Sequence, residues 1–169
     1  HEIELGAMRL DRYEVTNRQY KEFVDHGGYR EPEYWKQPYL KDGRILSWRE
    51  AMASFRDATG RPGPATWEGG TYAEGEHEHP VGGVSWFEAA AYAEFADKEL
   101  PTFHHWFKAF GPERVNLFAD IALYSNFGGK GPVAVGALGG ISPFGTFDMA
   151  GNVQEWCFTE SRGQRYLLG

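Results

Sequence analysis

The chain has 169 residues, a formal net charge of −7 and a single cysteine. The acidic balance argues against binding to nucleic-acid phosphates, which requires concentrated Lys and Arg. One cysteine excludes an internal disulfide framework, and no apolar run approaches the ~20 residues that span a bilayer. Because the chain starts at His1 without an initiator Met or signal-peptide pattern, we expect a processed or excised piece, and the sequence leaves its compartment open.

The first elements are predicted to be a strand followed by a helix. Apolar residues recur mainly at alternate positions over residues 3–10, which favours a half-buried strand. Thr16 and Gln19 then form a capping box, in which each side chain bonds the backbone N–H of the other residue. We expect this helix to end at Gly27-Gly28.

Residues 29–83 are irregular, and large aromatic residues are scattered among Pro, Gly and charged residues. A second capping box at Ser47 and Glu50 predicts a short helix over residues 47–56. The aromatic residues have two interpretations: a stacking surface for a ligand, or packing under long loops, which is the commoner use of large rings. The candidates for a ligand surface are Tyr29, Tyr34, Trp35, Trp48 and Trp67.

Ser85 and Glu88 cap the clearest helix, predicted to run to about Glu99 before Pro101. Thr102 begins another helix, which extends to about Phe110. A Gly-rich loop region follows over residues 126–145. The glycines there do not form a phosphate-binding loop, because no Lys-Ser/Thr pair follows them. Without repeats or a linker, we expect one domain over residues 1–169.

The segment from residue 148 to residue 157 combines polar oxygen donors with apolar anchors. The amide oxygen of Asn152, the carbonyl of Val153 and the carboxylate of Glu155 are hard ligands of the kind that Ca²⁺ prefers. The alternative is a turn in which Asn152 bonds its own backbone and Glu155 faces water. Cys157 is expected to be a packed, inert thiol. A zinc site at His77 and His79 is less favoured than a polar loop.

Three ordered motifs resemble the formylglycine-generating enzyme family, also called sulfatase-modifying factors. The segment Tyr13–Tyr20 with Phe23 is similar to the "YEVTNxxYxxF" motif of the family. Residues 79–106 resemble "HPVxxVSWxxA…LPTEAEW", although residues 103–105 read Phe-His-His instead of Glu-Ala-Glu. Residues 151–156 resemble "GNVWEW". The resemblance implies an α+β fold, irregular, loop-rich and C-type-lectin-like, with about three helices and short antiparallel strands.

The resemblance also carries expectations about metals. It implies a structural calcium site at Asn152, Val153 and Glu155. A second site is implied at Asn126, but the glycines that follow Asn126 offer no acid. Formylglycine generation in the family uses copper and a pair of cysteines located after this region. Copper is therefore not expected here, and the domain is expected to be clipped at both ends.

Three functions are consistent with the resemblance. The first is a non-catalytic binding or sensing module for a peptide or small molecule, such as those attached to bacterial Ser/Thr kinases. The second is a fragment of a copper-dependent formylglycine-generating oxidase whose cysteine pair lies beyond residue 169. The third, an iron-dependent sulfoxide synthase, would need a His-rich helical bundle that these residues lack. The expected partners are the rest of the polypeptide or a second copy, with no nucleic acid and no membrane span.

Overall fold

The structure is a computed structural model, and it describes residues 4–41, 43–111 and 123–169. It has a mixed α+β architecture, with four α-helices and short antiparallel strands in the described residues. The chain separates into two compact units: a central unit, Val15–Leu100, and a terminal unit, formed by His1–Glu14 and Pro101–Gly169. No helix in the described ranges is both long and apolar enough to cross a membrane.

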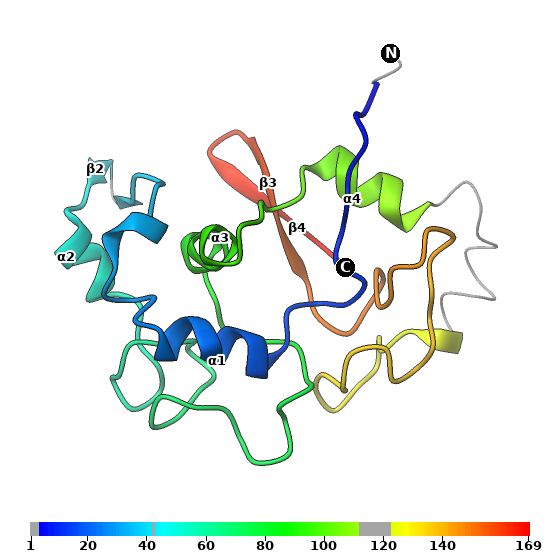
Figure 1. Cartoon of the computed structure of the whole chain (residues 1–169), viewed down its shortest axis with the longest axis horizontal. Coiled ribbons are helices and arrows are strands. Elements are labelled where there is room, and N and C mark those ends of the chain that lie inside the picture. The colour runs from blue at the N-terminus through cyan, green and yellow to red at the C-terminus, as the bar shows by residue number, and fades with distance from the viewer. Residues whose placement is uncertain (1–3, 42, 112–122) are drawn as a thin grey trace. The chain divides into compact units, whose positions relative to one another are not determined.

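The central unit is built on capped helices and loops. Helices α1 (Asn17–Asp25), α2 (Trp48–Met52) and α3 (Trp86–Phe95) begin after Thr16, Ser47 and Ser85, each of which closes a complete capping box. A 3₁₀ helix, η1 (Pro32–Tyr34), and a two-residue ladder between β1 (Leu40–Lys41) and β2 (Arg44–Ile45) complete the unit. Helices α1 and α3, blue and green in Figure 1, contact each other.

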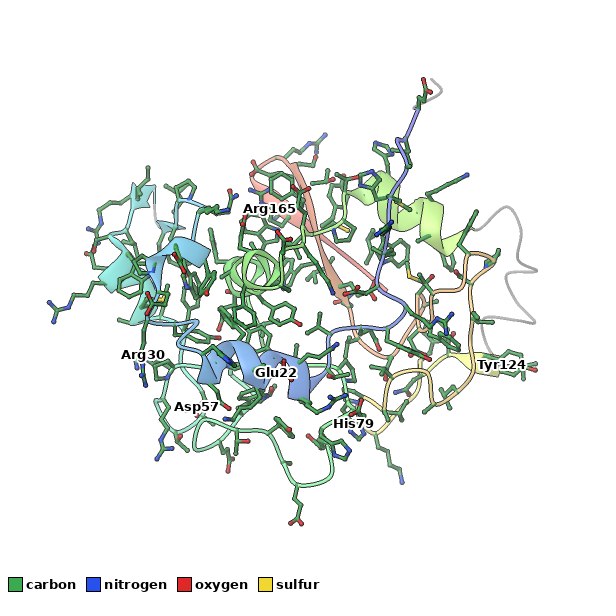
Figure 2. All side chains as sticks on the ribbon, in the orientation of Figure 1. Glu22, Arg30, Asp57, His79, Tyr124 and Arg165 are labelled. Carbon is green, nitrogen blue, oxygen red and sulfur yellow. The ribbon has the colours of Figure 1, made fainter. Side chains whose placement is uncertain are left out.

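The core of the central unit is aromatic. Tyr20 and Phe23 on α1 are 1% and 0% exposed, and Trp67 from the long loop is 1% exposed. Burying such large rings supplies most of the apolar contact available to a loop-rich unit. The loop is also held by Asp57, labelled in Figure 2. The carboxylate of Asp57 accepts hydrogen bonds from the backbone N–H groups of Thr59, Arg61 and Gly70, at 2.8, 2.8 and 2.7 Å.

The terminal unit pairs one helix with a hairpin. Helix α4 (Phe103–Phe110) begins at the Thr102 cap and ends at Gly111 in the left-handed conformation. Strands β3 (Glu155–Ser161) and β4 (Gln164–Leu168), orange to red in Figure 1, form an antiparallel hairpin with Glu155 opposite Leu168. The helix contacts β3, and its Phe103 N–H donates to Thr159 Oγ1 at 2.9 Å. Trp106, Ala109, Met149 and Cys157 form the core.

Several expectations about secondary structure need correction. Residues 4–10 form no strand and are mostly exposed, because alternation alone supplies no partner for pairing. The predicted helix over residues 47–56 is shorter, Trp48–Met52. Helix α3 ends at Phe95 instead of Glu99, since Asp97 adopts a left-handed φ of 55°. The β3–β4 hairpin was not predicted, although Arg162-Gly163, both at positive φ, is a recognisable hairpin turn.

Candidate functional site

Asn152 lies at the centre of a polar cluster in the terminal unit. The preceding Gly151 and Asn152 itself have positive φ angles of 87° and 61°, so the chain turns sharply here. The Asn152 amide pairs with the backbone of Val133: Oδ1 accepts from the Val133 N–H at 2.9 Å, and Nδ2 donates to the Val133 carbonyl at 3.2 Å. Nδ2 also donates to Glu14 Oε2 at 3.1 Å. Asn152 therefore ties three distant segments together.

Asn126 belongs to the same cluster as Asn152. The Asn126 carbonyl accepts from the Asn152 N–H at 3.1 Å, and Asn126 Nδ2 donates to Asn152 Oδ1 at 3.3 Å. Gly151 allows this approach, because a Cβ at that position would lie 3.0 Å from the Asn126 carbonyl oxygen. The two asparagines, assigned from the sequence to separate calcium sites, are in direct contact.

Three carboxyl groups gather around this cluster. The pKa of Glu14 is raised to about 8, chiefly by burial; the Asn152 hydrogen bond lowers it, and the nearby Asp148 and Glu155 carboxylates contribute to the rise. Burial likewise raises the pKa of Glu155 to about 7, opposed by the hydrogen bond from Trp106 Nε1. Burial also raises the pKa of Asp148, which accepts from the Gly136 N–H. Glu14 and Asp148 are buried and Glu155 is half-buried, so the cluster brings acidic groups together with limited access to water.

The fit of this cluster to calcium is mixed. Asn152 Oδ1 already accepts from two N–H groups, which leaves no lone pair for a cation. Glu14 Oε1, in contrast, is buried and has no hydrogen-bond partner within the described residues. Among residues 4–41, 43–111 and 123–169, no three His, Cys, Asp or Glu side chains are placed to hold a metal ion. The oxygens that remain for a cation are those of the carboxyl groups, not the Asn152 amide.

The remaining expected calcium ligand, the Val153 carbonyl, lies against the end of β4. A Cβ on Gly169 would lie 2.5 Å from this oxygen, so the carbonyl is closely covered by the chain. Sequence reasoning missed Glu14, Asp148 and Trp106 as members of the cluster. Glu14 lies in the first motif segment, and Asp148 begins the segment of residues 148–157. An acidic residue beside apolar ones was the sequence signal at both positions.

The five aromatic ligand candidates occupy different environments in the central unit. Tyr29 and Trp67, at 5% and 1% exposure, are core residues and present no surface to a ligand. Tyr34 is half-buried and packs edge-on against Phe23. Trp35 and Trp48, in contrast, line one open pocket of about 240 Å³. The sequence did not single out Tyr39 and Phe87, which line the pocket with them.

Cys157 is completely buried on β3. Burial raises the pKa of its thiol to about 12, with a further contribution from the Glu155 charge. A thiol in this environment stays protonated at neutral pH and is a poor nucleophile and metal ligand. The expectation of a packed thiol agrees with this position.

Together, the capped helices, the irregular loops and the polar cluster define a loop-rich α+β domain. The sequence matches the family described as sulfatase-modifying factor enzyme 1-like domain over residues 1–166. The chain therefore belongs to this family, whose fold is C-type-lectin-like. The resemblance of the three motifs is confirmed.

The chain is similar to proteins that are named for three different functions. It is 31% identical to a hercynine oxygenase of Mycolicibacterium smegmatis, over 92% of this chain and 38% of that protein. It is 32% identical to a serine/threonine-protein kinase of Chlamydia caviae, over 93% of this chain and 23% of the kinase. It is 28% identical to a formylglycine-generating enzyme of Thermomonospora curvata, over 92% of this chain and 60% of the enzyme. The chain thus spans between about a quarter and three-fifths of these relatives.

Proposed function

We propose that this chain is a non-catalytic binding or sensing module of the sulfatase-modifying factor family. The observation that carries this proposal is the open pocket beside Trp35 and Trp48, because aromatic-lined concave sites are the usual binding places of small ligands. The similarity to a kinase, of which this chain covers 23%, supports a role for the module within a larger polypeptide. The rest of that polypeptide, or a second copy of the chain, would be its partner.

The position of Cys157 supports the absence of catalysis by these residues. Copper-dependent oxidation of a cysteine needs accessible soft ligands, and the single thiol of the chain is buried with a raised pKa. The test is incubation of the purified chain with Cu(I) and a cysteine-containing peptide, followed by mass spectrometry. We expect the peptide to be unchanged. Formation of a peptide aldehyde would overturn the proposal.

The alternative is a portion of a formylglycine-generating oxidase. It is supported by the 28% identity to an enzyme of that name, of which this chain covers 60%. The same assay distinguishes the two functions when it is repeated with the full-length gene product. An aldehyde that forms with the full-length protein but not with residues 1–169 would favour the oxidase.

We further propose that calcium stabilises the polar cluster. Of the ligands expected from the sequence, Asn152, Val153 and Glu155 with Asn126 beside them, the Glu155 carboxylate would hold the ion, because the Asn152 amide oxygen already accepts two hydrogen bonds and the Val153 carbonyl is covered by the end of the chain. Three desolvated carboxyl groups, Glu14, Asp148 and Glu155, favour a bound cation electrostatically. If Ca²⁺ binds only the folded form, millimolar Ca²⁺ should raise the Tm and EDTA should lower it. Glu155→Gln should weaken this response. An unchanged Tm under both conditions contradicts the calcium proposal and leaves the module proposal intact.

A further inference from the structure

Three aromatic residues of the pocket lining, Trp35, Tyr39 and Phe87, are held by contacts within the central unit. The Trp35 indole donates its N–H to the Gly28 carbonyl at 2.8 Å and stacks on Phe55 with ring centroids 5.0 Å apart. The Tyr39 ring packs edge-on against Phe55 at 5.2 Å and against Phe87 at 4.5 Å. These contacts hold the three rings in place before any ligand binds, so binding would cost little ordering of these side chains.

The pocket carries no free charge among its described lining residues. Among the described residues that line the pocket, Lys36 is the one basic side chain, and its ammonium group pairs with Glu94. No Asp or Glu belongs to the described lining. A ligand with a net charge would therefore find no uncompensated opposite charge in the pocket, and the pocket favours a neutral ligand.

Polar groups around the pocket are available for hydrogen bonding. Within the part of the chain that the structure describes, the Gln37 amide, the Tyr39 hydroxyl and the Trp48 indole N–H have no hydrogen-bond partner in the protein. All three side chains are half-buried or exposed, so solvent serves as their partner in the free protein. They offer both donors and acceptors, which suits a ligand whose edge carries hydroxyl or amide groups.

We infer that this pocket binds a single ring of an uncharged sugar. A pyranose has a flat C–H face that packs on Trp and Tyr rings and a rim of hydroxyl groups that pair with polar side chains. The volume of about 240 Å³ is below the range of pockets for drug-sized ligands and suits one ring. This inference rests on the proposed binding function, because it names the ligand class of that same pocket.

Two other occupants of aromatic pockets match the observations less well. A quaternary ammonium group is attracted to ring faces but forms no hydrogen bonds. It would displace the water bound to Gln37 and Tyr39 and leave these side chains without a hydrogen-bond partner. A proline-rich peptide needs an extended groove several residues long. A pocket of about 240 Å³ bounded by α2 on one side does not provide that length.

The test follows the indole N–H resonances of ¹⁵N-labelled protein during ligand titration. The chain has six tryptophans, and the Trp48 signal is identified by its loss in Trp48→Phe. The ligands are glucose, mannose, galactose and N-acetylglucosamine, with choline and a triproline peptide as the competing classes. We expect at least one sugar to shift the Trp48 signal with a Kd on the order of 1 mM. The signal of Trp67, in the core, should stay in place.

Substitutions of pocket-lining residues test whether the sugar binds in this pocket. Tyr39→Phe and Gln37→Ala should each weaken sugar binding by about 2- to 10-fold, since each removes one hydrogen bond. Tyr166→Phe, the same deletion on β4 of the terminal unit, is the matched control and should leave the affinity unchanged. Equal effects of Tyr39→Phe and Tyr166→Phe would overturn the assignment.

The competing ligands decide the remaining outcomes. If none of the sugars shifts the Trp48 signal, or if only choline or triproline does, the sugar assignment is overturned. Binding of choline or triproline would leave the proposed binding module in place. Formation of a peptide aldehyde in the copper assay would overturn the non-catalytic function without affecting the sugar assignment.

Discussion

The Asn152 amide donates to the Glu14 carboxylate at 3.1 Å, across 138 positions of sequence. This bond joins the segment before α1 to the turn before β3, and both segments belong to the terminal unit. Because the same amide also pairs with both backbone groups of Val133, Asn152 holds three segments with one side chain.

Replacing Asn152 by Ala should therefore lower the free energy of unfolding by about 2–4 kcal/mol. The change removes the four hydrogen bonds of the side chain and places Ala at a φ of 61°. Urea unfolding followed by circular dichroism measures the loss. Asn152→Gly, which tolerates this φ, isolates the hydrogen-bonding part, and a loss below about 0.5 kcal/mol in both variants would contradict this role.

Stability should depend on pH through Glu14 and Glu155. Their pKa values in the folded chain, about 8 and about 7, lie above the ordinary 4.5, so the folded state favours the protonated forms. The stabilisation is complete below pH ~4.5 and is lost as pH rises through ~7 to 8. We expect the Tm in EDTA to fall across this window. Glu14→Gln should flatten the fall, and an unchanged slope in that variant would show that Glu14 does not titrate there.

Asp57→Asn should destabilise the loop of the central unit. Burial alone would raise the pKa of Asp57, but hydrogen bonds, led by the N–H groups of Arg61 and Gly70, lower it. An Asn side chain places an NH₂ group against one of these donors, at a cost of about 1–3 kcal/mol. The matched control is Asp25→Asn at the end of α1, where the carboxylate is exposed. Limited proteolysis should cut residues 57–70 sooner in Asp57→Asn than in the control.

Cys157 should report on opening of the terminal unit. The thiol is fully buried and its pKa is raised to about 12, so the native chain should react with a thiol reagent only after unfolding of the surrounding core. Because the chain has one cysteine, the signal has one source. The measurement is the rate of labelling with and without urea. Fast labelling in native buffer would show that the core around α4 and β3 is open.

Sequence patterns over three or four residues predicted the helix starts. Thr16, Ser47 and Ser85 each bond the residue three positions ahead. Both residues of a capping box therefore lie within one short stretch of sequence, where the pattern can be recognised. The motif segments likewise pointed to Asn152 and Glu155. What these side chains contact was not predictable, because Glu14, Val133 and Trp106 come from distant parts of the chain.

For the aromatic residues too, the sequence shows which residues are present but not which of them are buried. The sequence shows that Trp35, Trp48 and Trp67 stand among loop residues, but it does not show which ring is covered. Only tertiary packing places Trp67 in the core, where its indole donates to Asn17 Oδ1 at 3.0 Å, and leaves Trp35 and Trp48 beside an open pocket. The sequence by itself thus determined the family, the caps and the acidic charge, all of which depend on local order or composition. The tertiary structure decided the contacts of Asn152 and the location of the pocket, because burial depends on which distant segments meet.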